Sequence, residues 1–283
     1  MRAVSTPEEI ADLLKTVRKA DKAIGLVPTM GALHEGHFEL IKKSQSENDL
    51  TVVSIFVNPL QFDKKEDLDN YPRSKDNDLD QLRALDVDFV FIPEETHLYP
   101  SAPQVKIDFG RLGEVMEGTF RQGHFDGVGV VVSKLLNIIQ PASAYFGMKD
   151  LQQYLLIKQM CVDLSFPTLI VGVETVREES GLAMSSRNRR LSPHGLEVAC
   201  NLYKGLQIIA DGLHNEHSSG ELIDLAQDFY RSIDGLEIEY LEAFDGQTFT
   251  PVKSFDKVNE LAVCVAGYVE GVRLIDNLYL RLK

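Results

Sequence analysis

Short apolar runs separated by helix-like segments dominate the first 176 residues of the chain. Each run has about the length of one strand and stays apolar throughout, which is typical of parallel strands buried on both faces. Strands that alternate with helices in this way predict a parallel, doubly wound sheet. The runs predicted to be strands are residues 23–27, 50–57, 87–92, 144–147 and 168–173.

The segments between these runs carry helix signals. Thr6 is a capping residue, Pro7 suits the first helical position and Glu9 completes a capping box, so a helix is predicted to about residue 20. Further helices are predicted at residues 38–45, 74–85, 128–139 and 151–161. Other patterns predict a mobile surface loop at residues 63–73, an edge strand at residues 104–109 and a glycine-rich loop at residues 121–127.

Beyond Val176 the pattern changes. Two helices, at residues 193–213 and 220–232, are followed by strand-like runs at residues 237–243, 261–269 and 273–280 with no helix between them. Consecutive strands without crossover helices predict an antiparallel sheet. The chain is therefore predicted to be an α/β protein with a Rossmann-like, doubly wound parallel sheet in residues 1–176 and a smaller C-terminal α+β domain in residues 177–283.

The charge balance excludes some partners. With 43 acidic against 29 basic side chains and a net charge of −14, a general nucleic-acid or anionic-membrane surface is not expected. Cys161, Cys200 and Cys264 lie far apart in apolar surroundings, which predicts reduced core residues. No run reaches the ~18 apolar residues of a membrane span, and the acidic N-terminal segment is unlike a signal peptide. A cytoplasmic protein is expected.

Residues 28–37, which include His34, Gly36 and His37, follow one predicted strand and precede a predicted helix. Unpaired N–H groups and the helix dipole make such a junction an anion site. Two imidazoles three residues apart share a helical face, and each can donate an N–H to phosphate oxygens. An ordinary pair of surface or core histidines is the alternative. The spacing does not match the zinc motif H-E-x-x-H.

Two further clusters suit phosphate. Lys149 and Asp150 follow another predicted strand, so they are expected at the carboxyl edge of the same sheet, where doubly wound folds bind ligands. Ser185, Ser186 and Arg187 bring hydroxyls and a guanidinium together after a charged loop, which suits a mobile phosphate clamp. Solvated turns are the alternative for each cluster alone. Three such clusters in one chain favour a nucleotide site.

Six motifs in the same order, from about residue 23 to residue 192, closely resemble the pantothenate synthetase family. The histidine motif by itself indicates only the wider nucleotidyltransferase superfamily, whereas the combination is specific. The motifs are Pro28-Thr29-Met30-Gly31 with His34-x-Gly36-His37, Phe56-Val57-Asn58-Pro59-Leu60-Gln61-Phe62, Tyr71-Pro72-Arg73, Gly123-His124-Phe125, Phe146-Gly147-x-Lys149-Asp150-x-Gln152-Gln153, and Met184-Ser185-Ser186-Arg187-Asn188.

The resemblance implies an ATP-dependent, AMP-forming ligase that condenses pantoate with β-alanine to pantothenate, releasing AMP and pyrophosphate through an enzyme-bound pantoyl adenylate. It also implies Mg²⁺ on the phosphates and a homodimer. A carboxylate that attacks phosphorus needs charge neutralisation rather than a protein nucleophile, which fits the absence of a nucleophile motif. The smaller domain is expected to act as a lid that keeps water from the adenylate.

The resemblance also implies roles for individual residues. His34, His37, Lys149 and Arg187 are expected to be catalytic, with His37 as the donor that the family convention places there. Gln61 and Gln153 are expected to bind pantoate, and no metal ligand is carried over. The expected ATP-binding residues are Met30, Gly31, His34, His37, Gly147, Met148, Lys149, Asp150, Val176, Met184, Ser185, Ser186 and Arg187.

Departures and rivals remain. Gln122 stands where the family often has proline, and Asp126 where it often has arginine or another residue, so loop rigidity and local charge are expected to differ. One rival reading is a nucleotidyltransferase that acts on a phosphorylated acceptor. Another is a non-catalytic ATP-binding regulator, although the intact set of His34, His37, Lys149 and Arg187 speaks against it.

Overall fold

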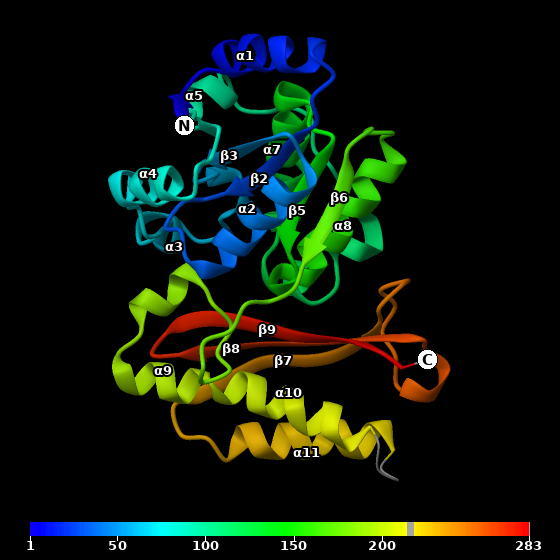
Figure 1. Cartoon of the computed structure of the whole chain (residues 1–283). Coiled ribbons are helices and arrows are strands. Elements are labelled where there is room, and N and C mark those ends of the chain that lie inside the picture. Colours follow the sequence, from blue (N-terminus) through cyan, green and yellow to red (C-terminus); the bar gives the residue numbers. More distant parts are fainter. Residues whose placement is uncertain (214–217, 283) are drawn as a thin grey trace. The chain divides into compact units, whose positions relative to one another are not determined.

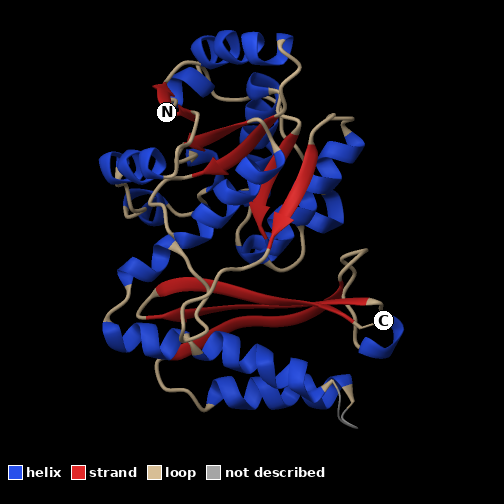
Figure 2. Ribbon diagram, in the orientation of Figure 1, coloured by secondary structure: helices blue, strands red, loops and turns tan. Residues whose placement is uncertain are grey.

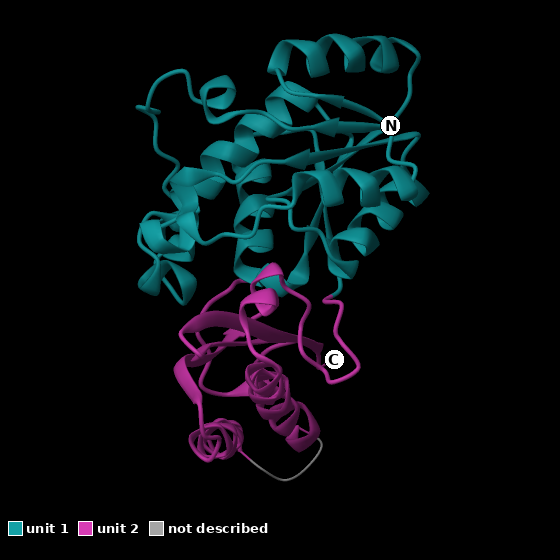
Figure 3. Cartoon of the chain, turned by 90° about the vertical axis from the view of Figure 1, so that its left-hand side faces the viewer, with its two compact units in different colours: residues 1–174 teal, residues 175–283 magenta. Residues whose placement is uncertain are grey.

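The computed structural model describes residues 1–213 and 218–282. The chain divides into two compact units, Met1–Glu174 and Thr175–Lys283, coloured separately in Figure 3. This division falls close to residue 176, where the character of the sequence changes. Each unit is built around its own sheet (Figure 2) and is described by itself.

The first unit contains a six-stranded sheet in the order β1-β4-β3-β2-β5-β6 (Figure 1). Every neighbouring pair is parallel, which confirms the predicted fold class. The short first strand was not predicted from the sequence. The strands are β1 (Arg2–Val4), β2 (Ile24–Thr29), β3 (Leu50–Ile55), β4 (Phe89–Phe91), β5 (Ser143–Gly147) and β6 (Leu169–Val173).

Helices cover both faces of this sheet. Consecutive strand residues point to opposite faces, so each strand contributes side chains to two cores. Leu26 packs in a core with residues of α1, α7 and α8, whereas Val27 packs in a second core with residues of α2 and α4. Both β2 side chains are fully buried. These helices are α1 (Pro7–Lys19), α2 (Glu35–Glu47), α4 (Lys75–Ala84), α7 (His124–Ile139) and α8 (Leu151–Asp163).

The connections contain shorter elements. Residues 63–73, predicted to be a loop, contain a one-turn helix, and Arg73 donates hydrogen bonds to three carbonyls of that segment. The glycine-rich loop is shorter than predicted, because α7 begins at His124. The short elements of this unit are η1 (Pro59–Gln61), α3 (Lys65–Asp69), α5 (Glu95–Leu98), η2 (Gly110–Gly113), α6 (Glu117–Phe120) and η3 (Met148–Asp150).

The predicted edge strand at residues 104–109 is wrong, because this extended segment has no strand partner among the described residues. Ile107 and Phe109 pack on the first core, and a Cβ at Gly129 of α7 would lie about 3 Å from both side chains. Val105 is exposed. The alternation in the sequence therefore comes from an extended segment lying on a helix rather than from a sheet.

The second unit contains a three-stranded antiparallel sheet in the order β7-β8-β9, as predicted. The predicted helix over residues 193–213 is divided at Cys200 into two helices. Helices and sheet share one apolar core. The elements are η4 (Ser186–Arg190), α9 (Pro193–Ala199), α10 (Asn201–Gly212), α11 (Ser219–Arg231), β7 (Leu236–Asp245), η5 (Phe255–Lys257), β8 (Glu260–Val269) and β9 (Val272–Arg281).

Two composition-based expectations can be compared with the structure. Cys161, Cys200 and Cys264 are all buried, in agreement with their predicted place in the core. Across residues 1–213 and 218–282, no helix combines the length and the apolar character that a membrane crossing requires.

The strand order fixes where a ligand can bind in the first unit. From β2 the chain proceeds outward through β3 and β4, and it later returns to place β5 on the other side of β2. The order therefore reverses between β2 and β5, and the carboxyl ends of these two strands meet at one edge. Open α/β sheets bind ligands at such a switch point.

Candidate active site

A strained turn follows β2 at this edge. Gly31 has a φ of 77° and Ala32 a φ of 51°, so two consecutive residues lie in the left-handed region. Such a φ costs little for glycine but is uncommon for alanine, so the surrounding structure must hold it in place. A Cβ at Gly31 would lie 3.0 Å from the carboxylate of Asp78.

Asp78, on α4, holds this turn. Its two carboxylate oxygens accept the backbone N–H groups of Ala32 and Leu33, each at 2.9 Å, and the Ser74 hydroxyl donates to it at 3.0 Å. Asp78 is only 1% exposed. A buried carboxylate with three donors is well satisfied. Its contact with the turn could not be predicted from the sequence, because Asp78 lies more than forty positions from Ala32 and Leu33.

His34 and His37 lie at the start of α2. The helix begins at Glu35, three residues earlier than predicted, so His34 is the N-cap residue and His37 lies in the first turn. Their ring centroids are 4.1 Å apart. The Nδ1 atom of His37 accepts the backbone N–H of His34 at 3.3 Å. In the neutral ring the proton then sits on Nε2, which makes that atom a hydrogen-bond donor.

Lys149 and Asp150 follow β5, the neighbour of β2, in the short helix η3. The side chain of Lys149 is 16% exposed, and its Nζ lies 3.8 Å from the Asp150 carboxylate. Gly147 ends the strand and Met148 begins η3. The structure thus places the predicted lysine and both histidines after adjacent parallel strands, at the same edge of the sheet.

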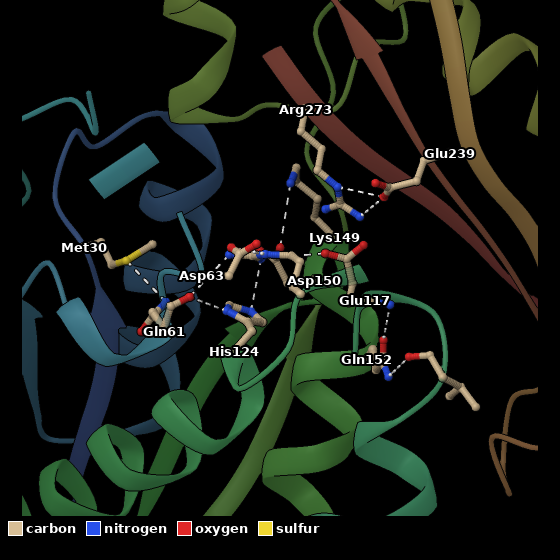
Figure 4. A network of polar contacts seen from close by, with 12 residues as sticks. Met30, Gln61, Asp63, Glu117, His124, Lys149, Asp150, Gln152, Glu239 and Arg273 are labelled. Atoms are coloured by element: carbon tan, nitrogen blue, oxygen red, sulfur yellow. Dashed lines mark hydrogen bonds and ion pairs between the residues drawn. The ribbon is translucent and has the colours of Figure 1, made fainter. Parts of the chain in front are cut away.

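Gln61 ends η1, the turn that follows β3, and it is buried. Its Nε2 lies 3.3 Å from the sulfur of Met30, and its Oε1 accepts from the side chain of Asn58 at 3.0 Å. The backbone carbonyl of Gln61 accepts from Nδ1 of His124 at 2.7 Å. Figure 4 shows Gln61 between Met30 and His124.

The two adjacent glutamines at the start of α8 differ in their surroundings. Gln152 is buried, accepts from the backbone N–H of Glu117 and donates to the carbonyls of Leu112 and Val115. It therefore anchors the segment that precedes α7 (Figure 4). Gln153, the predicted pantoate ligand, is half-buried. The sequence alone could not show that the neighbouring amide is a structural one.

The remaining predicted residues belong to the second unit. Met184 donates its backbone N–H to the carbonyl of Val176 at 2.9 Å, so these two residues lie side by side. Ser185 caps η4 by accepting the backbone N–H of Arg187 at 3.3 Å, and Ser186 is buried. The structure therefore groups Val176 with the 184–187 segment, within the second unit.

No cluster of three or more His, Cys, Asp or Glu side chains suited to hold a metal ion occurs in the part of the chain that the structure describes. Among the residues predicted to bind nucleotide, Asp150 supplies the carboxylate, and its side chain is half exposed. An ion at this edge would need most of its ligands from phosphate oxygens and water, as Mg²⁺ often does.

Comparison with known proteins agrees with these features. The family model described as pantoate-beta-alanine ligase matches residues 2–279. The chain is 42% identical to the pantothenate synthetase of Cytophaga hutchinsonii, and the match covers 100% of both chains. The Thermus thermophilus pantothenate synthetase structure is 40% identical with a TM-score of 0.92 and covers 98% of this chain and 99% of its own.

A further similar structure is described as a complex with ligands. The pantoate-beta-alanine ligase of Francisella tularensis, described as a complex with beta-gamma ATP and beta-alanine, is 37% identical with a TM-score of 0.81. The match covers 98% of this chain and 97% of that one. The similarity thus extends over both units.

Proposed function

The chain belongs to the pantoate-beta-alanine ligase family, and we propose that it condenses pantoate with β-alanine to pantothenate while converting ATP to AMP and pyrophosphate. One observation carries the proposal: two phosphate-suited segments, His34 to His37 and Lys149 to Asp150, follow the adjacent strands β2 and β5 at the switch point of the sheet. A ligase that activates an acid with ATP needs such a phosphate site.

In the first half-reaction, a carboxylate oxygen of pantoate bonds to the α-phosphorus of ATP. The bond from that phosphorus to the bridging oxygen breaks, and pyrophosphate leaves. Negative charge grows on the leaving group, so positioned N–H donors stabilise the transition state. The Nε2 atom of His37 is such a donor, because its Nδ1 already accepts a backbone N–H. Lys149 adds a positive charge.

In the second half-reaction, the amine of β-alanine attacks the carbonyl carbon of the pantoyl adenylate. The acyl–oxygen bond to AMP breaks, and the amine loses its proton as the amide forms. No protein nucleophile is needed, because the mixed anhydride is already activated. The site must instead orient the amine and exclude water from the anhydride.

Gln61 and Gln153 bind pantoate in this account, through amides that can donate and accept. The position of Gln61 supports this role, because it is buried and follows β3, and β3 pairs with β2, the strand that precedes the two histidines. Val176, Met184, Ser185, Ser186 and Arg187 are likewise assigned to ATP binding by their match to the family motifs.

Mg²⁺ is proposed as a partner of the ATP phosphates. It would neutralise phosphate charge and orient the leaving group. The half-exposed carboxylate of Asp150, which follows β5, supports a place near the ribose or the metal. A cytoplasmic homodimer is also proposed from the resemblance, and light scattering coupled to size-exclusion chromatography tests the dimer.

Product analysis tests the proposed activity. The protein is incubated with Mg²⁺, ATP, pantoate and β-alanine, and products are separated by chromatography. Pantothenate, AMP and pyrophosphate are expected in equal amounts. No pantothenate is expected when pantoate or β-alanine is left out. Turnover only with a phosphorylated acceptor would show a different nucleotidyltransferase. Nucleotide binding without any turnover would show a regulator.

A further inference from the structure

We propose that His124 is a positioning residue for the acid substrate, holding Gln61 through its backbone carbonyl while Arg121 holds the imidazole from the other side. This inference rests on the proposed function, since it takes Gln61 as the pantoate ligand. The Gly123-His124-Phe125 motif has no part in the nucleotide site described above, so its chemistry is otherwise unused.

The partners of His124 fix its tautomer. The carbonyl oxygen of Gln61, 2.7 Å from Nδ1, can only accept, so Nδ1 carries a proton. The guanidinium of Arg121, whose Nη1 lies 3.2 Å from Nε2, can only donate, so Nε2 is bare. The ring is therefore neutral and carries one donor and one acceptor, each used.

The charges around His124 agree with a neutral ring. Burial and then the nearby Arg121 charge lower the pKa of His124 to about 4. Arg121 is balanced by the carboxylates of Glu117 and Asp63, each 3.6 Å away. Its Nη2 also lies 3.4 Å from the Gln61 carbonyl. The positive charge of Arg121 is thus paired with two carboxylates, and its N–H donates to the neutral imidazole.

Gln61 needs such a support because of where it lies. It ends a three-residue turn, so helix hydrogen bonds leave its carbonyl unpaired. An unpaired buried carbonyl is costly. His124 sits in the first turn of α7, and this helix approaches η1 closely: a Cβ at Gly127 would lie 2.3 Å from the carbonyl oxygen of Leu60. The glycine permits the approach that brings His124 to Gln61.

The side-chain amide of Gln61 is set from a second direction by Asn58, which is 1% exposed. Oδ1 of Asn58 accepts from the Leu60 N–H and the Tyr99 hydroxyl, and its Nδ2 donates to the Gly127 carbonyl. These backbone partners define which end of the Asn58 amide is which. Asn58 therefore donates to Oε1 of Gln61, and Nε2, which lies 3.3 Å from the Met30 sulfur, has a second N–H with which to donate to a ligand.

The backbone and the side chain of Gln61 are thus held by different residues. With Asn58 intact, loss of the His124 contact is expected to loosen the η1 turn and misplace the amide. Binding of the acid should suffer most, because the His124 contact holds the turn after β3, whereas the histidines and Lys149 follow the strands β2 and β5. The predicted signature is a change in KM for pantoate without a matching change in KM for ATP.

Substitutions that copy one ring nitrogen at a time test this. Asparagine places an N–H near the Nδ1 position and keeps the donor to Gln61, whereas glutamine reaches the Nε2 position and loses it. We expect His124→Asn to stay within about 3-fold of wild type in KM for pantoate, and His124→Gln and His124→Leu to raise it about 10-fold or more. KM for ATP should change less than about 2-fold.

Thr168→Val is the matched control. Thr168 is 7% exposed, as is His124, and its hydroxyl donates to a backbone carbonyl, that of Pro141, at 2.9 Å. It precedes β6, at the amino end of a sheet strand, so it should affect stability without a selective change in KM for pantoate.

The readout is pantoate-dependent exchange of labelled pyrophosphate into ATP, supported by calorimetric titration with pantoate. A pantoate effect in His124→Gln that is absent in His124→Asn supports the inference. Equal effects on pantoate and ATP, no effect, or the same selective effect in Thr168→Val would overturn it. If His124→Leu does not fold, the Asn and Gln pair decides. A wild-type protein without pantoate-dependent exchange would instead refute the proposed function.

Discussion

The imidazole of His37 accepts the backbone N–H of His34 through Nδ1 at 3.3 Å. This bond satisfies one of the N–H groups left unpaired at the start of α2. It also fixes the tautomer, so that in the neutral ring Nε2 is the nitrogen that carries the proton. The same hydrogen bond therefore stabilises the start of the helix and sets the tautomer that the proposed contact with phosphate requires.

Removal of this donor should slow the reaction. His37→Ala is expected to reduce kcat/KM by at least about 10²-fold, since a positioned donor on developing charge contributes about 3 kcal/mol. His97→Ala is the matched control, because Nδ1 of His97 accepts the backbone N–H of Glu94 at 3.2 Å in the same way. Steady-state kinetics would contradict the assigned role if both variants turned over at similar rates.

Asp78 should act on nucleotide binding through the backbone. Asp78→Asn replaces one accepting oxygen by an NH₂ group, which then faces a backbone N–H of the Ala32–Leu33 turn. A lost bond to a charged acceptor costs about 1.5–3 kcal/mol. We expect a rise of at least about 10-fold in KM for ATP, measured by initial rates.

Asp88→Asn provides the control for the Asp78 variant. Asp88 accepts the backbone N–H of Thr51 at 2.8 Å, near the amino end of β3. Its replacement should reduce stability without raising KM for ATP selectively. A wild-type KM for ATP in the folded Asp78→Asn protein would refute the link between this carboxylate and the nucleotide turn.

Lys149 should be needed for the chemical step. Lys149→Ala removes a positive charge after β5 and is expected to lower kcat by at least about 10²-fold, because the phosphate charge then lacks a partner. Lys158→Ala, a substitution on α8 at an exposed position, should leave kcat near wild type. Single-turnover measurements of pyrophosphate formation check this, and equal rates for the two variants would contradict it.

The sequence indicated much of this arrangement correctly, and the reasons are local. Apolar runs such as that at β3 identify buried strands, because a strand covered on both faces cannot alternate. The histidine turn and Lys149 were placed at strand ends by their position after such runs. The helix cap at Thr6 also forms from residues three apart.

Other features depend on distant contacts and could not be read from the sequence. Asp78 meets the histidine turn only because α4 and the end of β2 are brought together by folding. His124 reaches Gln61 across 63 positions. In the segment at residues 104–109, apolar and polar residues alternate as in a strand, yet the segment packs on α7. The alternation alone therefore could not show whether the segment pairs with a strand or lies on a helix.

The buried His124 should make stability depend on pH. Its pKa is lowered to about 4 in the folded chain by burial and by Arg121, whereas the ordinary pKa of histidine is 6.5. Between these values the unfolded chain binds the extra proton and the folded chain does not, so the free energy of unfolding rises with pH there. This contribution is fully present above about 6.5 and is lost as pH falls to 4.

The comparison with His124→Asn isolates this effect, because asparagine does not titrate. The free energy of unfolding of wild type relative to the variant should fall by on the order of 3 kcal/mol between pH 7 and pH 4. Urea unfolding at several pH values measures it. The carboxylates of Glu117 and Asp150, whose charges raise the pKa of His124, are present in both proteins. A difference that does not change with pH would show that His124 titrates normally.

The central claim is that this chain activates pantoate as an adenylate. The most direct measurement is exchange of labelled pyrophosphate into ATP, with Mg²⁺ present and β-alanine absent. The account predicts exchange that requires pantoate and that falls by at least about 10²-fold in Lys149→Ala. Exchange that is absent with pantoate, or that proceeds equally well without it, would contradict the account.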